Sequence, residues 1–187
     1  MRRSDLQLLV EAHRLTEANE ILVVGSQSVL ATWDETQLPE AATRSAEADM
    51  LIRVQNGIRL TAEQADVVTE FLNQSGILSE FDEEHGVHID PISPNTAELP
   101  EGWEDRLVEI KAYAEDGHEV VGVCLDPYDA CASKAIAFRD HDREFIAAMI
   151  SADLIEPTVL QQRLEMYRGE REINHAFVYV QGFFENR

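Results

Sequence analysis

Short apolar runs occupy the first two thirds of the chain, and a helical repeat of apolar residues follows in the last third. Runs rich in Val, Ile and Leu predict strands. Such residues occupy successive positions of a buried strand and alternate with polar residues in a half-buried one. The predicted strands cover residues 20–24, 47–54, 106–113 and 119–125. The last two are separated by Glu115-Asp116-Gly117-His118, a turn-like segment, so we expect them to form a hairpin.

Helices are predicted on both sides of these strands. Apolar residues after Ser4 recur at near-helical spacing, and residues 61–73 begin with a Thr that can cap a helix. From Asp126 onward the apolar positions follow the helical period, and Pro157 suits the first turn of a helix. The aromatic-rich segment 173–184 fits either a helix or a late strand.

These elements predict an α/β (α+β) fold, in which a small mixed sheet is flanked by helices. We expect a core over residues 1–125 and a helical region over 126–187 that packs on it. With 187 residues, 44% of them hydrophobic, the chain can bury one full core. Cys124 and Cys131 lie in apolar surroundings without metal-binding spacing, which predicts buried, reduced thiols. A cytoplasmic protein without a membrane span is therefore expected.

The charge of the chain is strongly negative and uneven. The formal net charge is −21, and residues 61–125 contribute 2 basic and 16 acidic side chains to it. Such a surface repels phosphate backbones, so binding to nucleic acid would need a local basic patch. DNA is not expected as a partner, and the charge also argues modestly against RNA.

Acidic residues stand at the edges of predicted strands. Residues two apart on a strand point to the same face, so Glu47 and Asp49 would present both carboxylates on one side of the sheet. Asp90, which closes the apolar run 86–89, could add a third from a neighbouring strand. Clustered carboxylates repel one another unless a hard cation such as Mg²⁺ lies between them. Phosphoryl and nucleotidyl transfer use such a cation.

Two further segments suggest phosphate binding. Gly25 follows the apolar run 21–24 and permits a tight turn, after which Ser26 to Trp33 predicts a helix with free amides at its start. That arrangement suits a triphosphate, although an ordinary strand-to-helix turn would look the same. Arg44, just before the acidic pair, could grip phosphate or simply offset the carboxylates.

The order Gly25-Ser26, Glu47-Ala48-Asp49 and Asp90 resembles the motif order of the nucleotidyltransferase fold of the polymerase beta type. Within that superfamily the chain is most similar to the abortive-infection nucleotidyltransferase toxins of type IV toxin-antitoxin systems and their uncharacterised bacterial relatives. The resemblance runs from about Ile21 to Asp142. It departs from the pattern in having Glu47 instead of Asp, Ser26 instead of a second Gly, and a longer spacing between them.

The resemblance implies a Mg²⁺- or Mn²⁺-dependent enzyme that moves a nucleoside monophosphate from an NTP to an acceptor, with release of pyrophosphate. Glu47, Asp49 and Asp90 would be catalytic and hold the metal, and Gly25 and Ser26 would hold the β- and γ-phosphates. The acceptor stays open between RNA, a protein side chain and a small molecule. Membership of a toxin-antitoxin system would add a protein antitoxin as partner.

The resemblance also adds a Lys on a helix after the core sheet and an acidic residue some turns later. Lys134 and either Asp140 or Asp142 match these positions. A Lys among small residues must reach solvent or meet an anion. For Lys134 that anion is a triphosphate, or else Asp129 or Asp142. The alternative function is a member of the same fold that binds nucleotide or a protein without catalysis.

Overall fold

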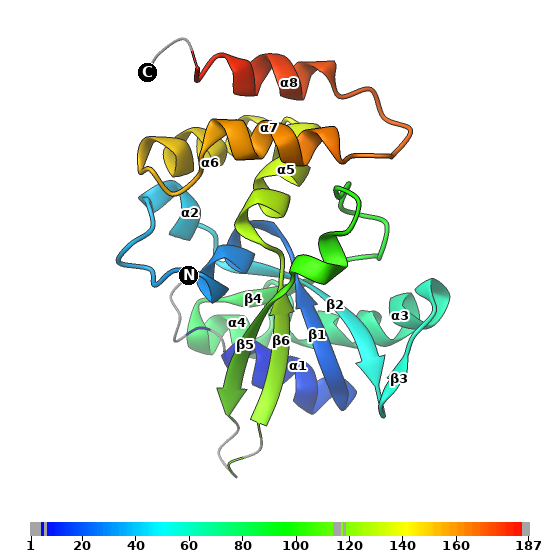
Figure 1. The fold of residues 1–187 in the computed structure, drawn as a ribbon. Helices are drawn as coiled ribbons and strands as arrows, with labels where there is room; N and C mark the ends of the chain where they lie inside the picture. The colour runs from blue at the N-terminus through cyan, green and yellow to red at the C-terminus, as the bar shows by residue number, and fades with distance from the viewer. Residues whose placement is uncertain (1–4, 6, 114–116, 118, 185–187) are drawn as a thin grey trace.

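The computed structural model describes residues 5, 7–113, 117 and 119–184, so Ser4, Glu115, Asp116 and His118 lie outside the described residues. Figure 1 shows a sheet with α1, α3 and α4 behind it and the helices α5 to α8 stacked above it. The sheet is mixed and the C-terminal part is helical, which confirms the predicted fold class.

The described residues form one six-stranded sheet in the order β3-β2-β1-β6-β5, and β4 pairs with β2. The strands are β1 (Ala18–Val23), β2 (Glu47–Gln55), β3 (Ile58–Arg59), β4 (His88–Pro91), β5 (Val108–Tyr113) and β6 (Glu119–Cys124). β1 is antiparallel to β2 and parallel to β6, whereas β2 is parallel to β4. The predicted hairpin is present as the antiparallel pair β5–β6.

Side-chain alternation along β2 separates two apolar cores on opposite faces of the sheet. Met50 and Ile52 point to one face of the sheet and pack with Leu8 of α1. Leu51 points to the other face and packs with Leu22 of β1. Because residues two apart share a face, Glu47 and Asp49 lie on the same side of the sheet as Leu51.

The helices alternate with the strands in the first part of the chain and follow one another in the last part. The α-helices are α1 (Gln7–Thr16), α2 (Glu40–Thr43), α3 (Ala62–Thr69), α4 (Glu80–His85), α5 (Pro127–Ala137), α6 (Asp140–Ser151), α7 (Pro157–Glu165) and α8 (Asn174–Gln181). The 3₁₀ helices are η2 (Gly25–Ala31), η3 (Glu70–Ser75) and η4 (Trp103–Arg106). In the described residues, no helix is both long enough and apolar enough to span a membrane.

Local sequence explains where these helices begin. Thr61 and Gln64 form a capping box at the start of α3, and Asp126 caps α5 by accepting a hydrogen bond from the Tyr128 amide at 3.0 Å. Pro157 occupies the first turn of α7, as predicted. The ambiguous tail is a helix, α8, whose Ala176 and Val180 are buried one turn apart.

The C-terminal helices share one apolar core with two earlier segments. Ile136 of α5, Ile146 of α6 and Leu160 of α7 pack in it together with Val29 of η2 and Ala42 of α2. The helical region therefore packs directly on the segments that surround the candidate site. Cys124 and Cys131 are buried free thiols, as predicted, and burial raises the pKa of each to about 12.

A buried ion-pair network joins the helices to the segment before β5. The side chain of Asp129 is fully buried in α5. Its carboxylate accepts hydrogen bonds from Arg106 of η4 at 2.8 and 3.0 Å and from Arg163 of α7 at 2.8 Å. Asp129 is therefore committed to these arginines and is not the partner of Lys134.

Candidate active site

The three predicted carboxylates lie on one face of the sheet. Asp49 of β2 and Asp90 of β4 are register partners in a parallel strand pair, and Glu47 stands opposite His88 in the same pair. Register partners point to the same side, so Asp49 and Asp90 are neighbours across the two strands. Asp90 is exposed on β4, Glu47 is exposed at the start of β2, and Asp49 is half-buried between them.

The charges around Asp49 oppose its ionisation. Burial raises the pKa of Asp49 from 3.8 to about 6, and the negative charges of Asp90 and Glu47 add to this increase. The positive charges of Lys134 and Arg139 act in the opposite direction but do not cancel it. The ionised form of Asp49 is therefore destabilised by burial and by its acidic neighbours, and a bound cation would stabilise it.

Gly25 lies directly against this carboxylate. A Cβ atom at position 25 would stand 1.9 Å from Oδ2 of Asp49, and the φ of Gly25 is +67°, in the left-handed region. The Val24 amide donates a hydrogen bond of 3.0 Å to the Asp49 carbonyl, which fixes the two segments together. Only glycine fits this position, because both its backbone angle and its missing side chain are needed.

The helix predicted after Gly25 is present with different bounds. It is the 3₁₀ helix η2 over Gly25–Ala31, whereas the prediction ran from Ser26 to Trp33. The Ser28 hydroxyl donates 2.8 Å to the Gly25 carbonyl, which offers that carbonyl a local partner in place of the α-helical one. Ser26 lies at the wall of a cavity that Asp49 also lines, and its hydroxyl accepts a 3.3 Å hydrogen bond from the Gln27 side chain.

Lys134 meets an anion, as the sequence requires. Its Nζ is 3.1 Å from Oδ1 of Asp142, and the two side chains are 14% and 3% exposed. The ammonium also lies 5.0 Å from the centre of the Phe145 ring. Of the two candidate acids, Asp142 is therefore the partner of Lys134, whereas Asp140 forms an ion pair with Arg143.

Arg44 is placed loosely at the same site. Its guanidinium is 3.7 Å from the Glu144 carboxylate, and both side chains are about two thirds exposed, at 64% and 63%. An exposed ion pair of this length contributes little to stability, so Arg44 can exchange Glu144 for another anion at small cost.

A cavity of about 490 Å³ brings most of these residues together. The predicted residues in its lining are Gly25, Ser26, Arg44, Glu47, Asp49 and Lys134. Asp90 is not in that lining and lies beside it through its pairing with Asp49. The volume lies in the range of small-molecule sites, so it can receive a nucleotide triphosphate group.

Sequence reasoning missed two residues of this cavity that can carry positive charge, Arg139 and His141. Phe138 ends α5 with a φ of 59°, and this reversal brings Arg139, the N-cap of α6, to the cavity beside Lys134. The available signal was the basic residue at a helix start within the Arg139-Asp140-His141-Asp142 segment. The reversal at Phe138 could not be read from the sequence, because nonglycine residues rarely adopt a positive φ.

The chemistry of the carboxylates fits a hard divalent cation. In the described part of the chain, no three His, Cys, Asp or Glu side chains are gathered closely enough to hold an ion by themselves. Mg²⁺ rarely uses such a protein cage and is commonly bound by one or two carboxylates together with substrate phosphates. Asp49 and Asp90, with Glu47 beside them, match this kind of site.

Comparison with known proteins identifies the family of the chain. Residues 5–181 match a family described as "Nucleotidyltransferase of unknown function (DUF6036)". No curated protein and no solved structure matches the chain. Since the match spans nearly the whole chain, the chain belongs to this family. The resemblance to the nucleotidyltransferase superfamily is thereby confirmed.

Proposed function

We propose that this nucleotidyltransferase transfers a nucleoside monophosphate from an NTP to an acceptor hydroxyl with the help of Mg²⁺ or Mn²⁺. The observation that carries the proposal is the pairing of Asp49 with Asp90 on one sheet face, with Gly25 in contact with the Asp49 carboxylate. Carboxylates held in mutual repulsion at the wall of a cavity are suited to a cation that arrives with its substrate.

Three cationic side chains in the cavity support binding of the triphosphate. Arg44, Lys134 and Arg139 line it together with the carboxylates of Glu47, Asp49, Asp142 and Glu144, although the chain has a net charge of −21. Gly25 and Ser26 lie at the same wall, where the backbone can approach a phosphate closely. We assign the β- and γ-phosphates to Gly25, Ser26 and the three cations, and the α-phosphate to the adjoining carboxylates, since Gly25 touches Asp49.

In the proposed reaction the acceptor oxygen attacks the α-phosphorus, and the bond between the α-phosphorus and the bridging oxygen to the β-phosphate breaks. The electron pair of that bond leaves with pyrophosphate. Asp90 takes the proton of the acceptor hydroxyl, because it is exposed on β4 and can be approached from solvent. Asp49 and Glu47 would hold the metal with Asp90, and the bound metal would neutralise charge on the reacting phosphate.

The direct test is label transfer from NTPs carrying ³²P at the α-phosphate to a cell extract or to the protein itself. We expect transfer by the wild type in Mg²⁺ or Mn²⁺ and none by Asp49→Asn. Asp66→Asn, a change of an exposed aspartate on α3, is the matched control and should transfer at the wild-type rate. Full activity of Asp49→Asn would disprove the assignment of the site.

A second candidate function is nucleotide binding without turnover. It is favoured by Glu47, which is exposed and stands where the superfamily pattern has Asp, because its longer side chain holds a metal less rigidly. Wild-type protein that binds NTP with metal but never transfers label, across all four NTPs and cell extract, would support this candidate over the enzyme.

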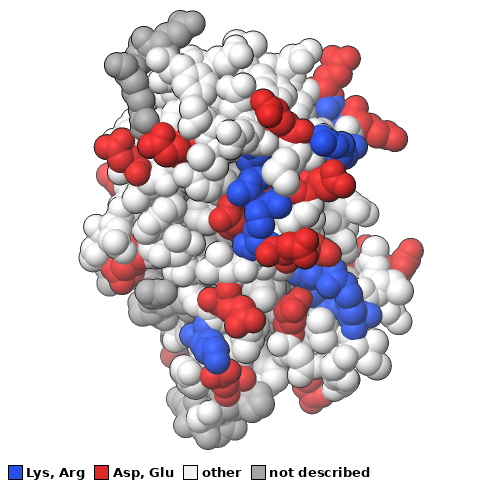
Figure 2. Space-filling view, viewed as in Figure 1, with Lys and Arg blue, Asp and Glu red and all other residues white. Residues whose placement is uncertain are grey.

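The acceptor and the biological role are also part of the proposal. On the face shown in Figure 2, Lys and Arg side chains are interspersed with Asp and Glu and form no large continuous patch. This distribution disfavours a long nucleic-acid acceptor on that face, and a protein or small-molecule hydroxyl suits it better. A cytoplasmic toxin with a protein antitoxin is proposed from the resemblance. Growth arrest on expression, absent in Asp49→Asn, would support it.

A further inference from the structure

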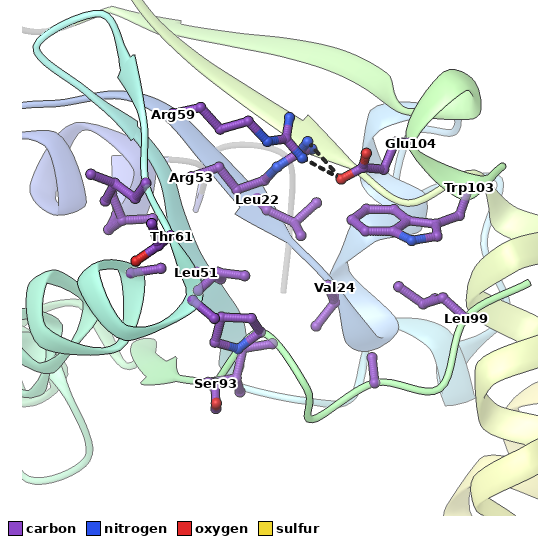
Figure 3. Close-up of a pocket in the computed structure, with 17 residues that line it drawn as sticks. Leu22, Val24, Leu51, Arg53, Arg59, Thr61, Ser93, Leu99, Trp103 and Glu104 are labelled. Atoms are coloured by element: carbon purple, nitrogen blue, oxygen red, sulfur yellow. Dashed lines mark hydrogen bonds and ion pairs between the residues drawn. The ribbon is translucent and has the colours of Figure 1, made fainter. Parts of the chain in front are cut away.

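A second, apolar cavity lies on the same face of the sheet, farther along β1 and β2 from the carboxylates. Its volume is about 150 Å³. Figure 3 shows Leu51 and Ser93 on one side of it, Trp103 and Leu99 on the other, and Val24 between them. None of the catalytic steps proposed above uses this cavity.

The two cavities adjoin each other. Val24, Ile92 and Ala97 line both of them, so they form one groove with different ends. The end at Lys134 is charged and polar, whereas the end at Trp103 is floored by leucines. The two ends of an NTP differ in the same way. Its charged phosphates are at one end, and its flat, uncharged aromatic base is at the other.

We propose that the apolar cavity binds the base of the NTP, with Trp103 as the stacking platform. This inference rests on the proposed function, because it requires the triphosphate to occupy the charged end of the groove. Bases of every kind stack on aromatic side chains, so Trp103 would supply affinity rather than a choice of base.

The rim of the cavity carries groups that can read the edge of a base. Glu104 accepts hydrogen bonds from both Arg53 and Arg59, and Figure 3 shows the two guanidinium groups converging on it. The side chain of Arg53 is 8% exposed, and its guanidinium carbon lies 5.4 Å from the centre of the Trp103 ring. Arg53 therefore holds the indole in place while its charge is shared with Glu20 and Glu104.

One nitrogen of the Arg53 guanidinium makes no hydrogen bond within the described residues. This nitrogen, Nη1, is buried. Buried donors without a partner are rare and costly. A carbonyl oxygen or ring nitrogen on the edge of a base that reaches Arg53 would satisfy this donor.

Calorimetric titration tests the proposal by removing the base from the ligand and the platform from the protein. The ligands are the four NTPs and ribose 5-triphosphate, which lacks a base, each with Mg²⁺. The proteins are the wild type, Trp103→Leu and the matched control Trp33→Leu, whose tryptophan lines neither cavity. We expect the wild type to bind NTPs at least about fivefold more tightly than ribose 5-triphosphate.

In Trp103→Leu this preference should largely disappear while the affinity for ribose 5-triphosphate stays at the wild-type value. Trp33→Leu should keep the preference. Equal binding of NTP and ribose 5-triphosphate by the wild type would overturn the base pocket and leave the proposed function intact. If neither ligand binds the wild type, the proposed function itself is wrong. Equal weakening of both ligands in Trp103→Leu would show a structural role for the indole and would also overturn the proposal.

Discussion

Replacing Asp49 by Asn should make the protein more stable at neutral pH while abolishing nucleotide transfer. The carboxyl and the amide have nearly the same shape, so the close contact with Gly25 is retained. What changes is the charge that burial, Asp90 and Glu47 all oppose. The variant therefore isolates the electrostatic cost of the site from its packing.

The expected size of this effect follows from the pKa of Asp49. A carboxyl whose pKa rises from 3.8 in the unfolded chain to about 6 in the folded protein binds its proton more tightly when folded. The difference corresponds to about 3 kcal/mol as an upper bound. Because the half-buried group still meets solvent, we expect a gain of about 1–3 kcal/mol in the free energy of unfolding.

The pH dependence has a definite sign. Well below pH 4 the Asp49 carboxyl is protonated in both states, so the wild type and Asp49→Asn should be equally stable at this site. As the pH rises from about 4 to about 6, the wild type loses this stability and the variant does not. Above about pH 6 the difference between the two proteins should be constant.

Urea unfolding of both proteins between pH 4 and pH 8, without divalent cations, measures this difference directly. Asp66→Asn removes one negative charge from the exposed surface of α3 and controls for the general repulsion in an acidic chain. Added Mg²⁺ should stabilise the wild type and leave Asp49→Asn unchanged. A variant no more stable than the wild type at pH 8 would refute the account of Asp49 as a strained carboxylate.

Substitutions at three further positions test the neighbours of Asp49. Gly25→Ala should lower the free energy of unfolding by about 1–3 kcal/mol, because a Cβ would meet the Asp49 carboxylate and the φ of Gly25 is positive. Urea denaturation measures this change, and an unchanged midpoint would contradict the contact. Lys134→Met should weaken NTP binding about tenfold or more in calorimetry. It should also lower the free energy of unfolding, because the buried Asp142 loses its partner. Unchanged affinity would remove Lys134 from the phosphate site. Glu47→Asp should keep or raise the transfer rate, since the shorter acid holds a metal more rigidly, whereas Glu47→Gln should reduce the rate severely. An inactive Glu47→Asp together with an active Glu47→Gln would exclude a metal-ligand role for Glu47.

The strands that position the site were predictable because their apolar content is local information. The runs at 20–24 and 47–54 correspond closely to β1 and β2, and alternation alone places Glu47 and Asp49 on one face. The short strand β3 was missed although Asn56-Gly57, with φ values of 51° and 73°, is a strong hairpin signal. β3 itself is only two residues long, so it adds no apolar alternation that would predict a strand.

The surroundings of the site were less predictable, because they depend on contacts between distant segments. The register that sets Asp90 beside Asp49 joins residues about forty positions apart, and nothing local to either strand specifies it. For Lys134, the sequence left a phosphate and two acids as partners. The choice of Asp142 depends on the turn at Phe138, which brings α6 back along α5.

The Asp129 network determines how the molecule can move. Its three hydrogen bonds tie η4, α5 and α7 to a single buried carboxylate, and separating any of these elements would leave a charge without its partner at a cost of about 3–5 kcal/mol. Movement of the C-terminal helices away from the sheet is therefore disfavoured. We expect the helices and the sheet to move as one body and the whole chain to unfold in one cooperative transition.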